Sequence, residues 1–186
     1  MTKTQYGRSM IEMLGVLAII GVLSVGGITG YTKAMEKYKS NQSVEQLTTI
    51  LTNIKSLGLR KRSFSGITTS AAIKLKAAPE EMIRTTSDGK KELRNVYEGE
   101  VIVGSDDTKA RNFYVQYKSL PKPACISMAT QDWGSNKVAV FVSNNNAEPS
   151  ISTIKTTASC STESGSSVCW NQMMTPSAAA TGCSCS

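Results

Sequence analysis

Residues 7–32 read GRSMIEMLGVLAIIGVLSVGGITGYT, and the 20 residues from Met13 to Thr32 carry no charge. An α-helix rises about 1.5 Å per residue, so a helix of this length matches the roughly 30 Å hydrocarbon core of a bilayer. Five glycines are spread among Leu, Ile and Val in this run, and small residues at that density favour close packing between helices. The stretch therefore predicts a helix that can cross a membrane and pack tightly against other helices.

Glu12 stands at the head of the apolar run. An ordinary secretory signal has a basic start, an apolar stretch of about 7–15 residues and a small-residue cleavage site, for which Ser24-Val25-Gly26 would serve. A carboxylate at the start of the run argues against that alternative, because a charge drawn into a membrane costs about 3 kcal/mol and generally has a dedicated partner. A plain membrane anchor is the other alternative that stays open.

Gly7, Arg8 and Glu12, followed at once by the apolar run, resemble the class III signal of type IV prepilins and type II secretion pseudopilins. The resemblance implies that residues 1–7 are a cytoplasmic leader. It implies that prepilin peptidase cuts between Gly7 and Arg8, and that Arg8 becomes the methylated N-terminus. Glu12 then falls at the fifth mature position, where the family has a glutamate that attracts the N-terminal amine of the neighbouring subunit and sets the axial register. Arg8 departs from the family pattern, which usually has an apolar residue there.

Residues 33–58 continue the helical pattern but become amphipathic. Apolar residues recur at helical spacing along one side, namely Val44, Leu47, Ile50, Leu51, Ile54 and Leu57. The pattern predicts a helix over about 9–57 that ends with Gly58 as its C-cap, with Gly26-Gly27 as the expected place of any interruption. The basic run Arg60-Lys61-Arg62 fits a solvated helix end. Such a helix would be about 75 Å long, which suits a subunit whose projecting half is buried among identical helices.

The rest of the chain predicts a small α+β head. Strand candidates lie at 100–103, 112–117 and 138–142, separated by turn signals at 88–89, 105–107 and 143–146. Residues 63–70 are expected to form a loop, and residues 79–83 a short helix that begins at Pro79. The economical arrangement is one antiparallel sheet of three to five strands packed on the amphipathic helix.

The resemblance extends into this head. Residues 93–100, with Asn95 and Gly99, resemble the N-x-x-x-G lead-in to the first strand of the type IVb PilS-like major pilins, and residues 120–126 with Asp132-Trp133-Gly134 resemble their helix before a later strand. It implies the pilin α/β roll: a long helical spine packed on a small antiparallel sheet, with a disulfide-bonded C-terminal lobe. The implied division is a leader at 1–7, a transmembrane and filament-core half of the helix at 8–32, an amphipathic half at 33–58 and a head at 59–186.

The five cysteines lie in the last third of a chain that has no histidine; they are Cys125, Cys160, Cys169, Cys183 and Cys185. Zinc sites usually show C-x-x-C or Cys/His pairs, which these spacings lack, so the cysteines predict structural disulfides and an oxidising compartment. Spacing alone leaves the connectivity open. The resemblance to the family implies Cys125 bridged to Cys183 or Cys185 and Cys160 bridged to Cys169, with the fifth thiol free or paired between subunits.

The motifs that carry catalysis do not occur in the sequence, which has no histidine, no phosphate-binding loop and no G-x-S-x-G, so we expect no enzyme, no cofactor and no metal. Calcium would need clustered acids near the C-terminus, where Glu163 is the only acid after Glu148. The resemblance implies a structural subunit of a type IV pilus-like filament, with a minor pilin or a type II secretion pseudopilin as the alternative.

The implied partners are identical subunits, prepilin peptidase, the pilus assembly platform and the inner membrane, which holds the chain before it is assembled into an extracellular filament. The net charge of +7 also allows the filament to contact DNA or a host surface.

Overall fold

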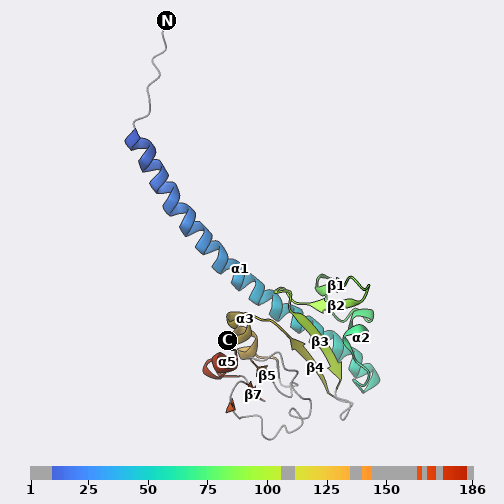
Figure 1. Ribbon diagram of the computed structural model, residues 1–186. Coiled ribbons are helices and arrows are strands. Elements are labelled where there is room, and N and C mark those ends of the chain that lie inside the picture. The colour runs from blue at the N-terminus through green and yellow to red at the C-terminus, as the bar shows by residue number, and fades with distance from the viewer. Residues whose placement is uncertain are drawn as a thin grey trace. The chain divides into compact units, whose positions relative to one another are not determined.

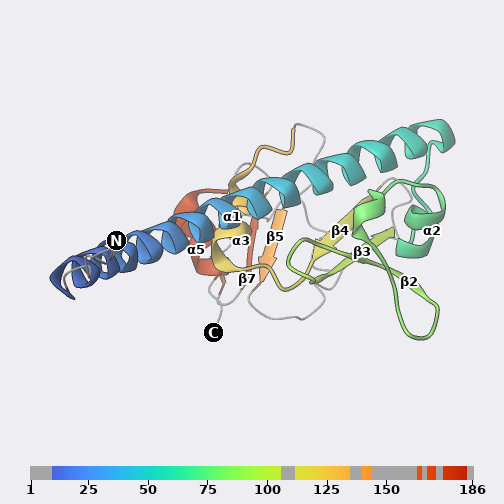
Figure 2. The same cartoon turned by 90° about the horizontal axis from the view of Figure 1, so that it is seen from above.

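The computed structural model describes residues 10–105, 112–134, 140–143, 163–164, 167–170 and 174–183. The chain divides between Tyr38 and Lys39 into two compact units. The described part of the first unit is helix alone, and the second unit holds the remaining helices and strands (Figures 1 and 2). A long helix followed by a small antiparallel sheet and a disulfide-bonded lobe confirms the predicted α+β class.

Helix α1 runs from Met10 to Lys61. It passes through Gly26 and Gly27 as helix, because a helical glycine costs only about 1 kcal/mol and still donates its backbone N–H to the ladder. The prediction that Gly58 caps the helix is wrong. Gly58 is a buried helical residue, and a side chain at this position would collide with the ring of Phe64. The helix ends at Lys61 instead, and Arg62 follows it in the left-handed conformation with φ of 54°.

The buried face of α1 in the second unit is centred on Ile50 and Ile54. Polar residues extend this face toward the N-terminus: Ser43 donates to the Lys39 carbonyl (3.1 Å) and Gln46 donates to Glu81 (2.8 Å). Three residues expected in the centre of the apolar stripe are only half-buried, namely Val44, Leu47 and Leu51. Hydrophobic periodicity misplaced the centre of the buried helix face because it does not recognise polar side chains that are buried with hydrogen-bond partners.

A four-stranded antiparallel sheet in the order β1-β2-β3-β4 lies beside this half of α1 (Figures 1 and 2). Its strands are β1 (Ile83–Thr85), β2 (Lys91–Arg94), β3 (Glu100–Ser105) and β4 (Phe113–Tyr117). Leu93 pairs with Val101, which pairs with Tyr117. Leu93, Val101 and Val103 are buried in one core with Ile50 and Ile54. Alternating residues of β3 thus pack the sheet on the helix.

The strands at 100–103 and 112–117 are confirmed, whereas β1 and β2 were not predicted. They flank the Asp88-Gly89 turn, in which Gly89 has φ of 73°, so the turn signal was correct and its strands were missed. Other local differences are small. The short helix at Pro79 is a 3₁₀ turn, η1 (Glu80–Met82), and the loop expected at 63–70 gives way to helix α2 (Thr69–Lys74), capped by the Thr68 hydroxyl.

The turn that carries the N-x-x-x-G pattern is held by one buried side chain. Asn95 accepts hydrogen bonds from the backbone N–H groups of Tyr97 (2.8 Å) and Gly99 (3.0 Å), and its amide donates to the Lys118 carbonyl (2.9 Å). A Cβ on Gly99 would collide with that carbonyl. The asparagine and the glycine are therefore required together, because they place the turn directly against the segment that follows β4.

The C-terminal lobe has a sheet of its own. Strands β5 (Val140–Ser143), β7 (Ser167–Trp170) and β6 (Glu163–Ser164) are antiparallel in the order β5-β7-β6. Helices α3 (Lys122–Thr130) and α5 (Pro176–Gly182) pack with β5 around buried Ala129, Val142, Met174, Ala178 and Ala179. The expectation of one sheet that includes the strand at 138–142 is wrong, because α3 intervenes after β4 and the partner of β5 is a distant segment.

Candidate assembly helix and disulfide-closed lobe

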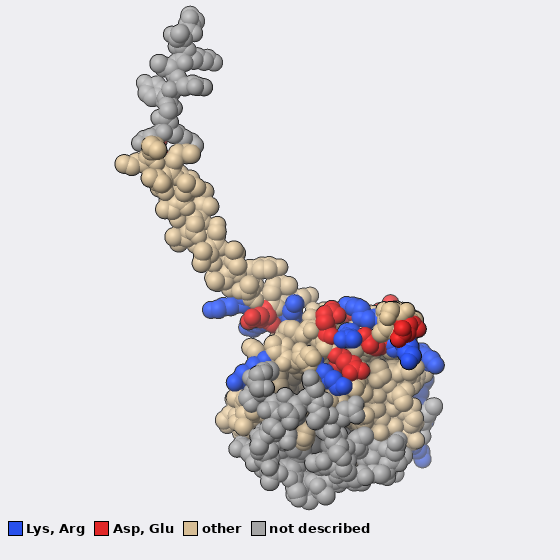
Figure 3. Space-filling model, viewed as in Figure 1, with Lys and Arg blue, Asp and Glu red and all other residues tan. Residues whose placement is uncertain are grey.

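The first half of α1 is apolar and uncovered. The large apolar side chains from Met10 to Ile28 are all more than half exposed, and an 18-residue window of this helix has a mean hydropathy of 2.2 with none of it buried. Figure 3 shows this half, on the face in view, as a surface without acidic or basic side chains. Soluble monomers rarely expose an apolar surface of this size. The helix therefore requires an apolar environment, which lipid or other protein helices can supply.

Hydroxyl groups within this half bind the helix itself. Ser24 donates to the Ile20 carbonyl (2.8 Å), Thr29 donates to the Val25 carbonyl (3.1 Å), and Thr32 donates to the Thr29 carbonyl (3.0 Å). In a bilayer every polar group must find its partner within the protein, and these side chains do so on their own helix. The polar residues of this stretch are thus compatible with an apolar environment.

The glycines of this half leave the helix surface open. A Cβ built on any of them would meet nothing within 4 Å; they are Gly15, Gly21, Gly26, Gly27 and Gly30. Another helix can approach the backbone closely at such positions. This part of the surface is suited to close contact with another helix.

Glu12 lies in the first turn of α1 and is exposed. A carboxylate there is favoured by the partial positive charge of the helix N-terminus. Gly7 and Arg8 lie outside the described residues, so cleavage between them, methylation of Arg8 and the register role of Glu12 stay predictions.

A disulfide closes the C-terminal lobe. Cys125 of α3 is bonded to Cys183 at the end of α5, across a sequence separation of 58 residues. Of the two partners that the family resemblance allowed for Cys125, the structure has Cys183. Cys160 and Cys185 lie outside the described residues, and so does the side chain of Cys169, which leaves the expected bridge between Cys160 and Cys169 a prediction.

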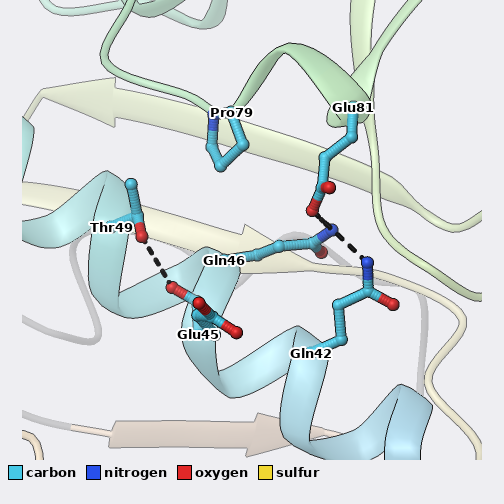
Figure 4. A pocket seen from close by; sticks show the side chains of 6 residues that line it. All are labelled: Gln42, Glu45, Gln46, Thr49, Pro79 and Glu81. Atoms are coloured by element: carbon cyan, nitrogen blue, oxygen red, sulfur yellow. Dashed lines mark hydrogen bonds between the residues drawn. The ribbon is translucent and has the colours of Figure 1, made fainter.

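A polar pocket formed by α1 together with Pro79 and Glu81 of the head was not predicted. It has a volume of about 270 Å³ and is lined by Gln42, Glu45, Gln46, Thr49, Pro79 and Glu81 (Figure 4). One carboxylate oxygen of Glu81 accepts hydrogen bonds from the amides of Gln46 (2.8 Å) and Gln42 (3.4 Å). The only signal in the sequence is the spacing of Gln42, Gln46 and Thr49, which puts three polar side chains on one helix face.

Comparisons with known proteins place this geometry in a family. A model described as "PilS N terminal" matches residues 37–173. The chain is 28% identical, over 182 residues, to proteins named "Major structural subunit of bundle-forming pilus" from Escherichia coli O111:H- and from Escherichia coli O127:H6 (strain E2348/69 / EPEC). Each alignment covers 97% of this chain and 89% of the relative.

Among solved structures, the chain is similar to a type IV b pilin from Salmonella typhi. The two are 21% identical with a TM-score of 0.36, and the alignment covers 48% of this chain and 66% of that one. The family assignment rests on the model, which matches well over half of the chain, and on the two relatives. The chain belongs to the PilS family of type IVb pilins.

Proposed function

We propose that the chain is a structural subunit of an extracellular type IV pilus-like filament, polymerised through the apolar half of α1. The observation that carries the proposal is the continuous exposure of this apolar half in a chain of the PilS family. Burial of apolar surface stabilises by about 25 cal/mol per Å². Twelve large exposed side chains therefore supply a strong drive to leave water, and identical helices packed side by side satisfy it. The role is structural and requires no catalytic residue.

The same surface serves before assembly. The length and hydropathy of the helix fit insertion in the inner membrane, with residues 1–7 as a cytoplasmic leader that prepilin peptidase removes after Gly7. The assembly platform would then extract the subunit from lipid into the filament. In this division residues 8–32 form the filament core, residues 33–58 pack on the head, and residues 59–186 form the outer surface.

Glu12 is proposed to set the axial register by binding the N-terminal amine of the neighbouring subunit. A carboxylate moved into an apolar filament core needs an opposite charge, because an unpaired buried ion is strongly destabilising. We expect Glu12→Ala to reduce the chain in sheared surface filaments about tenfold or more while its amount in the membrane stays unchanged. Glu36→Ala removes a carboxylate from the same helix beyond the apolar run and serves as the matched control.

The outcomes separate the two claims. If Glu12→Ala yields as much filament as the unaltered chain, Glu12 has no part in register. If the unaltered chain is itself missing from sheared material, the filament function is wrong.

Abundance distinguishes a major subunit from a minor pilin or pseudopilin. The relatives are named major structural subunits, which supports the first alternative. A major subunit is expected to be the dominant protein of purified filaments. Binding of DNA or of a host surface stays a prediction from the charge of +7, and it would weaken steeply with salt.

A further inference from the structure

We propose that the polar pocket on the head is the receptor for basic side chains of a second copy of this chain. These side chains come from the opposite end of the head, where α1 ends beside α2. The inference rests on the proposed function, since it names a contact between subunits of one filament. It concerns a surface that lies outside the apolar half of α1.

The pocket presents acceptors without a cation. Glu45 and Glu81 both line it, and no described residue places a basic group within 4 Å of either carboxylate. Other head carboxylates behave differently. Glu92 binds Arg94 at 2.7 Å and raises the pKa of that guanidinium, and Glu100 binds Lys118 at 2.9 Å. The Glu45 and Glu81 carboxylates thus have no ion-pair partner among the described residues, and the Arg84 guanidinium donates to the Glu81 backbone carbonyl (2.8 Å) instead of to its carboxylate.

A buried acceptor lies at the back of the same pocket. Gln46 is 4% exposed, and its Oε1 has no hydrogen-bond partner among the described residues. Its amide nitrogen and that of Gln42 both donate to Glu81 and hold the carboxylate in place (Figure 4). An unpartnered buried carbonyl oxygen costs about 1–3 kcal/mol, and its partial negative charge adds to that of the two carboxylates that a cationic group would meet in this pocket.

A metal ion is the less suitable occupant. Calcium takes 6–8 oxygen ligands, roughly, with several carboxylates among them, whereas the pocket offers two carboxylates and neutral amides. In the part of the chain that the structure describes, no group of three or more Asp, Glu or Cys residues could hold a metal ion. The ammonium or guanidinium of a long side chain requires fewer acceptors and carries its apolar stem against Pro79 and Thr49.

The complementary surface is the basic end of the head, formed by Arg60, Arg62 and Lys74, all of them exposed. None of these three has a carboxylate of a described residue within 4 Å, whereas Lys76 contacts Glu80, next to the pocket, at 3.9 Å. Two apolar side chains lie among them, Leu59 (78% exposed) and Leu75 (55% exposed). These leucines supply apolar area that docking would bury around the ion pairs. Lys90 and Lys91 are another exposed basic pair, but they lie beside the polar Asp88-Gly89 turn and lack such apolar neighbours.

The two surfaces lie at different places on one head. Along α1, Arg60 lies 11 residues beyond Thr49 and 14 beyond Gln46 of the pocket, which corresponds to roughly 16–21 Å. A contact between different surfaces of identical subunits is heterologous, and such contacts propagate into open helical polymers. An acidic pocket and a basic end at different places on one subunit therefore fit head-to-tail contact between successive subunits of a filament.

Charge reversal in full-length chains tests the contact. Glu81→Lys and Glu45→Lys each neutralise the pocket, from a formal charge of −2 to 0, and the two together reverse it to +2. Glu45 is at an exposed helix position. Arg60→Glu combined with Lys74→Glu reverses the basic end. Each variant alone should lower the chain in sheared filaments about tenfold, because like charges then face each other. Asp88→Lys makes the same charge change as the pocket variants at an exposed turn and should assemble like the unaltered chain.

Co-expression decides between a contact within one subunit and a contact between subunits. A pocket-reversed chain and an end-reversed chain restore both junctions when they alternate, so together they should recover filaments that contain both masses in similar amounts. A Lys90→Glu chain in place of the end-reversed one keeps both surfaces, so it should form filaments of its own mass and leave the pocket-reversed chain out of them. Normal assembly of Glu45→Lys and Glu81→Lys, or loss without recovery on co-expression, overturns the inference. Absence of filaments from the unaltered chain and from Asp88→Lys overturns the proposed function as well.

Discussion

Tyr117 carries a hydroxyl group that is buried without a hydrogen-bond partner among the described residues. Burial raises the pKa of this phenol above its ordinary value of about 10. A folded-state pKa above the unfolded one means that the neutral phenol is favoured on folding. The preference of the folded state for the neutral Tyr117 phenol therefore leaves the free energy of unfolding unchanged below about pH 10 and lowers it as the pH rises further.

Tyr117→Phe removes the unpartnered hydroxyl and keeps the ring. We expect the free energy of unfolding to rise by about 1 kcal/mol near neutral pH, because the cost of burying that hydroxyl disappears. The variant should also lose less stability than the unaltered chain as the pH rises above about 10. Thermal unfolding of the full-length chain in detergent measures both effects. Tyr38→Phe removes an exposed hydroxyl and should change neither; a loss of stability in Tyr117→Phe would show that the hydroxyl has a partner.

Gly58 and Phe64 are coupled at the end of α1. Alanine is the better helix former by about 1 kcal/mol, yet Gly58→Ala should lower the free energy of unfolding by about 2 kcal/mol, because its methyl group would meet the Phe64 ring. In a Phe64→Leu background the same substitution should cost less, since the ring is gone. Unfolding of the two single variants and the double variant measures this coupling. Equal effects in both backgrounds would show that the ring does not fill the space over Gly58.

At the scale of elements, strong periodic segments could be predicted and short polar ones could not. β3 and β4 were found because Val101, Val103 and Val115 belong to runs of β-branched and aromatic residues. β2 reads KELR, in which Leu93 alone is buried, so its composition resembles a helix or loop. It forms a strand because the Asp88-Gly89 turn and pairing with Val101 impose it. Such context exists only after folding.

The disulfide between α3 and α5 is an element-scale clamp. Closing a loop of this length removes unfolded-state entropy worth about 4 kcal/mol. The double variant Cys125→Ala with Cys183→Ala should therefore open the C-terminal lobe first. Hydrogen exchange of the full-length chain is expected to rise strongly in α3 and α5 and little in β3 and β4, whose core is separate. A uniform rise across both sheets would contradict this separation.

Only part of the candidate site could be predicted from the sequence. Glu12 and the apolar run could be identified from the sequence because their spacing is local. The pocket could not, because Glu81 is brought to Gln42 and Gln46 over 39 and 35 residues by the fold. Gln46 also occupies a buried position that a hydrophobic pattern assigns to an apolar residue.

The whole molecule combines a solvent-exposed apolar helix with a head that has hydrophobic cores of its own. Membership in the PilS family and the exposed helix both support a filament subunit. Removal of a leader before the apolar run would leave that helix at the very N-terminus, where it can enter a filament core. The position of the N-terminus therefore tests the account at this scale.

The most direct measurement is the N-terminal sequence and intact mass of the chain from membranes and from sheared surface filaments, with and without prepilin peptidase. We predict a chain that begins at Arg8 in the filaments, with or without a methyl group, and one that keeps Met1 in membranes that lack the peptidase. A chain that keeps Met1 in every fraction, or one that begins near Gly27, would contradict assembly through this helix.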